Sequence, residues 1–154
     1  GMPAGVCFFR ETCGAALAVE HNGDVYACDH YVEPAYHLGN LMSDPLASLV
    51  NSPRQQQFGL QKRDSLPAYC RKCEVRFACH GECPKNRFLT TPDGEPGLNY
   101  LCAGYKAFFH HVAPYMKFMA MCLRRGLSPL PVMEMARRQS RGETPSDTID
   151  KAPN

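Results

Sequence analysis

The sequence lacks the features that are typical of membrane-spanning, nucleic-acid-binding and secreted proteins. No apolar run approaches the roughly 18 residues that a membrane-spanning helix needs. The net charge of +2 is too small to predict binding to nucleic acid or to an anionic membrane. The first residues show no basic segment followed by an apolar one, so we expect no secretory signal and a cytoplasmic location. We therefore expect neither nucleic acid nor a membrane among the partners.

Cysteine, in contrast, is abundant, with nine residues in a chain of 154. Without a secretory signal, a chain this rich in cysteine is more often metal-binding than disulfide-bonded. The count is also odd, so at least one thiol would stay outside any set of disulfides. Metal or iron–sulfur ligation is therefore the main prediction, with disulfides or reduced core thiols as the alternatives.

Short apolar runs and turn signals predict a small α+β domain organised around metal. Residues 15–19 and 24–28 have the composition of strands. The Asn-Gly pair between them is typical of a tight hairpin turn, because both residues tolerate positive φ. The two ends of a hairpin lie close together, so Cys13 and Cys28 should converge there.

Helices are expected in the rest of the domain. One should begin after Ser43 or Asp44, either of which can cap it. A second should run from about residue 52 to 62, and a longer one should cover about 103–125. Pro114 should kink or divide the long helix, because proline removes a backbone hydrogen bond. The connections are expected at residues 37–43 and 90–97.

The sequence divides into three predicted parts. Residues 1–6 are expected to be a tag or linker, and residues 7–126 the cysteine-rich domain. Residues 127–154 are expected to be a mostly flexible extension, since their tail is polar and rich in proline, serine and threonine. Because a cysteine follows so soon after Gly1-Met2, we also expect the chain to be a piece of a longer protein.

The spacing of the cysteines leaves two interpretations open. Four of them, beginning with a C-x2-C knuckle, could hold one tetrahedral zinc while the other cysteines stay structural. Iron–sulfur clusters also take four thiolates each and often use C-x2-C spacings, so spacing alone does not choose the metal. The four residues are Cys70, Cys73, Cys79 and Cys83.

The Cys83-Pro84 pair favours iron–sulfur chemistry. In two-cluster ferredoxins, a closing Cys-Pro ligates the other cluster instead of the local one. The same arrangement here would give two interleaved sites. The first would use Cys7, Cys13, Cys28 and Cys83, and the second Cys70, Cys73, Cys79 and Cys102. Cys122 has no place in either set and should be a buried thiol on the apolar face of the long helix.

The cysteine series C-x5-C-x14-C, then C-x2-C-x5-C-x3-C-x18-C, resembles the SPASM domain of radical S-adenosylmethionine enzymes. The segments GDVYACDHYVEPAYHLGNL (23–41) and CRKCEVRFACHGECPKNRF (70–88) resemble the C-terminal domain of anaerobic sulfatase-maturating enzymes. The resemblance implies two auxiliary [4Fe–4S] clusters, each with four protein ligands, that transfer electrons and support the structure. It assigns Cys7, Cys13, Cys28 and Cys83 to the first cluster, and Cys70, Cys73, Cys79 and Cys102 to the second.

The resemblance also implies a reaction, the oxidation of a cysteine or serine of a sulfatase to Cα-formylglycine. Asp29, directly after Cys28, takes the position of the family's catalytic aspartate, which is suited to accept a proton as a general base. The simpler interpretation of Asp29 is a turn cap or the partner of a nearby cation. The implied partners are a sulfatase polypeptide, the enzyme's own radical S-adenosylmethionine domain, and an external electron donor or acceptor.

One departure from the family is large. The C-x3-C-x2-C motif for the cluster that binds S-adenosylmethionine does not occur in these residues. The cofactor and its third [4Fe–4S] cluster would therefore bind an absent domain, and this chain alone is not expected to be catalytic. In isolation its clusters could be lost or replaced by zinc. The alternatives are a SPASM domain of another peptide-modifying radical enzyme, or a non-catalytic zinc-binding interaction module.

Overall fold

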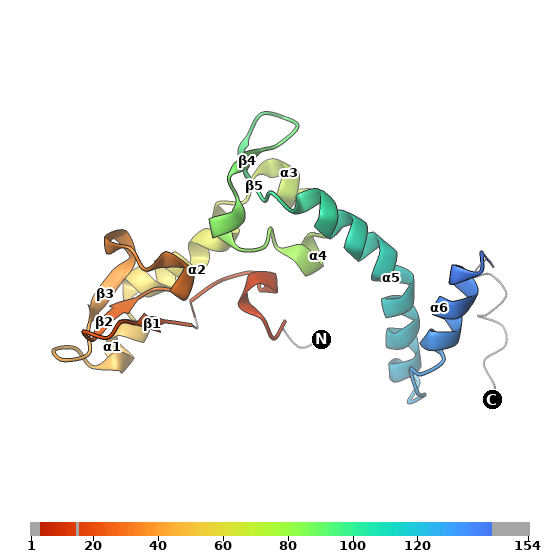
Figure 1. Ribbon diagram of the computed structural model, residues 1–154, viewed down its shortest axis with the longest axis horizontal. Coiled ribbons are helices and arrows are strands. Elements are labelled where there is room, and N and C mark those ends of the chain that lie inside the picture. The colour runs from red at the N-terminus through yellow and green to blue at the C-terminus, as the bar shows by residue number, and fades with distance from the viewer. Residues whose placement is uncertain (1–3, 15, 143–154) are drawn as a thin grey trace. The chain divides into compact units, whose positions relative to one another are not determined.

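The computed structural model describes residues 4–14 and 16–142, which form two units (Figure 1). The first unit is Gly1–Tyr105 and the second is Lys106–Asn154. Parts of the predicted N-terminal tag and of the predicted flexible tail, residues 1–3 and 143–154, lie outside the described residues. The expected mixture of helices and small sheets is confirmed.

A three-stranded antiparallel sheet begins the first unit, in the order β1 (Ala18–Val19), β2 (Asp24–Tyr26) and β3 (His37–Asn40). The predicted hairpin is confirmed as β1 and β2, although its strands are shorter than expected. Its turn places Gly23 at φ +87°, where a side chain would be strained.

Strand β3 was expected as part of a connection, and that prediction is wrong. Side chains as well as backbone groups join β3 to β2. Asp24 Oδ1 on β2 accepts a hydrogen bond from Asn40 Nδ2 at 2.9 Å and lies 3.1 Å from His37 Nε2. Contrary to the prediction, Asp44 does not cap the helix that follows. Its carboxylate accepts from the Asn40 backbone N–H at 2.9 Å, so α1 (Leu46–Val50) begins after Pro45 without a side-chain cap.

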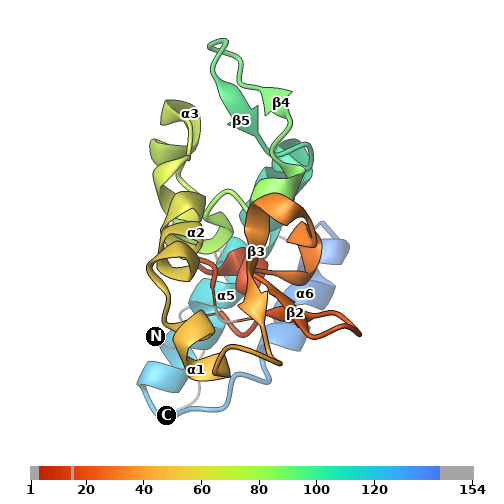
Figure 2. The same ribbon diagram turned by 90° about the vertical axis from the view of Figure 1, so that its left-hand side faces the viewer.

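Helix α2 (Pro53–Asp64) confirms the second predicted helix and lies beside the sheet (Figures 1 and 2). Ser52 caps it, with Oγ accepting from the Gln55 backbone N–H at 3.2 Å. The Gln55 side chain is almost fully buried and donates to the carbonyls of Gly14 and Ala27 at 3.2 and 3.0 Å. The helix is therefore joined to the chain on both sides of the hairpin.

The remainder of the first unit consists of short elements. Residues 90–97 were expected to be a loop, but their ends pair as a second, two-stranded sheet. The short helices are α3 (Ala68–Arg71) and α4 (Arg76–Cys79), and the strands are β4 (Leu89–Thr90) and β5 (Pro96–Leu98). The 3-10 turns are η1 (Cys7–Phe9), η2 (Asp29–Tyr31), η3 (Pro34–Tyr36) and η4 (Pro84–Asn86).

The long predicted helix is confirmed as α5 (Cys102–Arg124), which begins in the first unit and continues into the second. It runs through Pro114 undivided. In the second unit, Tyr115 Oη donates to Gln139 Oε1 of α6 (Val132–Ser140) at 2.6 Å. Cys122 is buried, as predicted. Among the described residues no helix has both the length and the apolar character to cross a membrane.

Candidate metal centre

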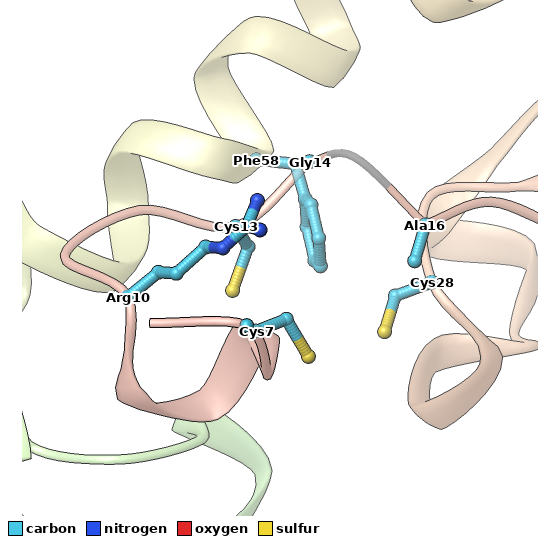
Figure 3. A pocket seen from close by; sticks show the side chains of 8 residues that line it. Cys7, Arg10, Cys13, Gly14, Ala16, Cys28 and Phe58 are labelled. Atoms are coloured by element: carbon cyan, nitrogen blue, oxygen red, sulfur yellow. The ribbon is translucent and has the colours of Figure 1, made fainter. Parts of the chain in front are cut away.

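Three cysteines from separate segments line one cavity of about 310 Å³ (Figure 3). Cys7 lies on η1, Cys13 precedes the sheet, and Cys28 follows β2. Their side chains face the same space together with the Phe58 ring from α2. The hairpin thus brings Cys13 and Cys28 to a common site, as the sequence predicted, and the N-terminal segment adds Cys7.

Cys83 belongs with this group although it is far away in the sequence. Burial raises the pKa of the Cys13 thiol, and negative charge on Cys83 and Cys7 raises it further. The pKa of Cys28 is raised to about 11, first by burial, with Cys13 among the further causes. We call Cys7, Cys13, Cys28 and Cys83 the first cysteine group.

Four of the other five cysteines, on or next to α3, α4 and the start of α5, make up a second cysteine group. The pKa of Cys70 is raised to about 11, mainly by burial and then by repulsion from Cys102, Cys79 and Cys73. Burial also raises the pKa of Cys79, to which charge on Cys102 and Cys73 contributes. The second group is therefore made of Cys70, Cys73, Cys79 and Cys102.

The two groups follow the interleaved interpretation of the cysteine spacing, which stays a prediction. In the described part of the chain, no three or more cysteine, histidine, aspartate or glutamate side chains are drawn together closely enough to hold a single metal ion. Four thiols per group are nevertheless the donor set that a [4Fe–4S] cluster takes. Since raised pKa values keep thiols protonated at neutral pH, binding such a group would release protons.

A buried lysine lies beside the first cysteine group. Lys62 on α2 has no exposed surface, and its ammonium donates to the carbonyls of Cys7 and Phe8, both at 2.8 Å. Burial lowers the pKa of Lys62, while negative charge on Cys13 and Cys7 opposes that change. The cation therefore holds the N-terminal segment on α2 and would offset the negative charge of the first group once its thiols ionise.

Asp29 lies on η2, exposed to solvent and next to the first cysteine group. The Cys28 thiol donates to Asp29 Oδ1 at 3.1 Å, and this bond is the main reason why the pKa of Asp29 is lowered. Backbone N–H groups of Asp29 and His30 contribute to this lowering as well. Asp29 is therefore an accessible carboxylate at neutral pH and can accept a proton.

His30 and Lys62 are two neighbours of the site that sequence reasoning missed. His30 lies exposed in the turn after β2, and its Nδ1 is 3.4 Å from Cys83 Sγ. That contact joins residues 53 positions apart, so no local pattern could indicate it. The burial of Lys62 could not be predicted from the sequence either, because a lysine near the end of a polar helix is normally exposed.

Comparison with known proteins finds a family model that matches part of this cysteine framework. Residues 7–74 match the SPASM family, an iron–sulfur cluster-binding domain. The match agrees with the resemblance that the cysteine series indicated.

Several relatives that match most of the chain are anaerobic sulfatase-maturating enzymes. It is 53% identical over 134 residues to the serine-type enzyme of Bacteroides thetaiotaomicron, covering 87% of this chain and 32% of the relative. It is 32% identical over 108 residues to the cysteine-type enzyme of Clostridium perfringens, covering 70% of this chain and 29% of the relative.

A solved structure supports the same relationship. Native anSMEcpe with bound AdoMet and Kp18Cys peptide aligns with a TM-score of 0.61 and 31% identity, over 72% of this chain and 30% of that one. The chain therefore spans about a third or less of the length of the relatives that it matches.

Proposed function

We propose that this chain is the auxiliary-cluster domain of an enzyme that oxidises a sulfatase cysteine or serine to Cα-formylglycine. The observation that carries the proposal is the match of residues 7–74 to an iron–sulfur cluster-binding domain, and the cavity that Cys7, Cys13 and Cys28 share supports it. One [4Fe–4S] cluster would be held by each group. The ligands would be Cys7, Cys13, Cys28 and Cys83 in the first, and Cys70, Cys73, Cys79 and Cys102 in the second.

Full protein ligation suits a cluster that exchanges electrons and does not bind substrate. A bound four-iron cluster supplies a site that takes up or gives back one electron. Lys62 would offset part of the negative charge in the first group, since its ammonium lies against the Cys7 carbonyl. The two groups would also join segments that are far apart in the sequence.

Asp29 would be the proton acceptor. After a hydrogen atom leaves the target's Cβ, the remaining oxidation releases one proton and one electron from the target side chain. The Asp29 carboxylate is exposed beside the first cysteine group and would take the proton. When Cys28 is a thiolate ligand, it no longer donates to Asp29, so one cause of the lowered pKa is removed and the carboxylate becomes a stronger base.

The remaining components would come from outside these residues. S-adenosylmethionine and a third [4Fe–4S] cluster would bind the enzyme's radical domain, and an external protein would exchange electrons with the auxiliary clusters. A serine-type and a cysteine-type relative and an anSMEcpe complex with the Kp18Cys peptide support a sulfatase polypeptide as substrate. The cytoplasm, where thiols stay reduced, suits this chemistry.

The test is turnover by the full-length enzyme after anaerobic preparation. The enzyme is incubated with S-adenosylmethionine, a reductant and a sulfatase peptide that carries cysteine or serine at the target position. The proposal predicts an aldehyde at that position, detected by mass spectrometry. An iron-loaded enzyme that cleaves S-adenosylmethionine but leaves both peptides unmodified would overturn the proposed substrate, and a preparation that takes up only zinc would overturn the clusters.

A further inference from the structure

The loop between Cys79 and Cys83 joins the two cysteine groups, and its backbone is unusual. His80, Gly81 and Glu82 have φ values of 46°, 72° and 55°. Three successive residues in the left-handed region are uncommon, and two of them carry side chains that disfavour it. Contacts from elsewhere in the unit must therefore support this loop.

Arg87 makes those contacts. Its Nε donates to the Gly81 carbonyl at 2.9 Å, and its Nη2 donates to the carbonyls of His80 and Glu82, both at 3.0 Å. All three carbonyls of the loop are thus bound by one guanidinium. The approach is close, because a Cβ on Gly81 would lie 2.9 Å from Arg87 Nη2.

The same side chain also reaches the end of α2. Arg87 Nη1 donates to the Lys62 carbonyl at 2.7 Å and to Ser65 Oγ at 3.3 Å. Lys62 in turn holds the Cys7 carbonyl with its ammonium at 2.8 Å. Two cations therefore connect the N-terminal segment, α2 and the loop before Cys83.

The charge of Arg87 acts on both cysteine groups. Burial lowers the pKa of Arg87, and negative charge on Cys70 and Cys79 of the second group and on Cys13 and Cys83 of the first opposes that change. Lys62 differs, since the cysteines that act on it are all in the first group: Cys13, Cys7 and Cys83. Arg87, bound to the loop that links Cys79 to Cys83, thus carries a charge that acts on both groups, whereas the cysteines that act on Lys62 are in the first group.

Glu82 carries the opposite charge on the same loop. Its carboxylate is 5% exposed and accepts from Asn86 Nδ2 at 2.9 Å and from Asn99 Nδ2 at 2.5 Å. It raises the pKa of both Cys79 and Cys83, after burial and other causes. The loop therefore places a negative charge near both groups, and Arg87 is the cation that opposes it there.

We propose that Arg87 is a positioning residue shared by the two sites, which holds the loop from Cys79 to Cys83 and raises the reduction potential of both clusters. The inference rests on the proposed two-cluster function. Reduction adds negative charge to a cluster, so a nearby cation favours the reduced form. Arginine suits the role because its planar fork carries five donors and stays charged.

The test measures potentials and iron content in the full-length enzyme, not its turnover. Midpoint potentials are followed by electron paramagnetic resonance in two backgrounds, Cys70→Ala, which retains the first cluster, and Cys13→Ala, which retains the second. Arg87→Gln removes the charge, Arg87→Lys keeps it but loses the fork, and Glu82→Gln removes the opposing charge. Arg54→Lys is the matched control, because exposed Arg54 also donates to a backbone carbonyl, at 2.8 Å.

Arg87→Gln should lower the potential in both backgrounds and Glu82→Gln should raise it in both. Arg87→Lys should bind less iron but keep potentials closer to wild type, and Arg54→Lys should change nothing. Unchanged potentials in loaded Arg87→Gln, or a change in only one background, would overturn the inference. If Arg87→Gln binds too little iron to titrate, the Glu82→Gln variant is titrated instead. Potentials that are unchanged in this variant, or that rise in only one background, would overturn the inference. An unsubstituted enzyme without clusters would instead overturn the proposed function and the inference with it.

Discussion

The imidazole Nδ1 of His30 lies 3.4 Å from Cys83 Sγ, although 53 positions separate the two residues. The contact joins the turn after the hairpin, which also carries Asp29, to a cysteine that follows the loop held by Arg87. A hydrogen bond to a ligating sulfur stabilises negative charge there and raises the potential of a cluster. His30 is therefore expected to act on the first cluster alone.

Replacing His30 with alanine should lower the midpoint potential of the first cluster and leave that of the second unchanged. The measurement is a redox titration of the full-length enzyme in the two single-cluster backgrounds. His21→Ala is the matched control, because the His21 side chain is 93% exposed and near Glu20. Equal potentials for the His30 and His21 variants would show that the contact to Cys83 has no influence on the first cluster.

Asp29→Asn should reduce formylglycine formation by about 10²-fold or more while iron content stays at the wild-type level, because an amide cannot accept the proton. Asp29→Glu should restore part of the rate. Asp93→Asn, a change at an exposed turn residue, should have no effect. If Asp29→Asn turns over like wild type with both clusters present, Asp29 is only a turn residue.

Gly59→Ala should damage the first cysteine group specifically. A Cβ at Gly59 would lie 2.6 Å from the Cys13 carbonyl oxygen, and the Gly59 carbonyl accepts from the Cys13 N–H at 3.1 Å. Relief of this clash must move Cys13, at a cost of about 1–3 kcal/mol in unfolding free energy. Iron analysis should show preferential loss of the first cluster. Gly104→Ala is the control, since a Cβ there meets nothing within 4 Å.

The pairing of β2 with β3 should depend on pH through Asp24. Hydrogen bonds from Asn40 and Asn22 and the contact with His37 lower the pKa of Asp24 in the folded state. A carboxyl whose folded pKa is below its unfolded value stabilises the fold above the unfolded pKa, and this contribution is lost as pH falls through the folded pKa. In urea titrations, the stability difference between wild type and Asp24→Asn should therefore shrink as the solution is acidified below about pH 4. A difference that is constant with pH would contradict this role.

Local signals predicted much of the fold. The Asn-Gly pair gave the hairpin, and Ser52-Pro53 gave the start of α2, because a turn and a cap depend on a few adjacent residues. Strand β3 was missed because its pairing depends on Asp24, which lies 16 positions before Asn40. The Asp44 cap was wrong for a related reason, since the Asn40 N–H competes for the same carboxylate.

The sequence indicated which cysteines could form the candidate site, but it did not indicate the charged residues that lie around them. The predicted hairpin brought Cys13 and Cys28 together, and both line the same cavity as Cys7. The cations could not be assigned in this way, since Lys62 and Arg87 act through backbone carbonyls of distant segments. Backbone acceptors have no sequence signature, so such contacts are found only in the folded chain.

The most direct measurement of the central claim is iron and acid-labile sulfide per chain in anaerobically prepared full-length enzyme, compared between Cys83→Ala and Cys79→Ala. Two interleaved clusters predict that each variant loses about four iron and four sulfide. They also predict that the Cys83 variant loses the same cluster as Cys13→Ala, and the Cys79 variant the same cluster as Cys70→Ala. If Cys83 and Cys79 prove to serve one site, or if both variants and wild type hold zinc without sulfide, the two-cluster account is wrong.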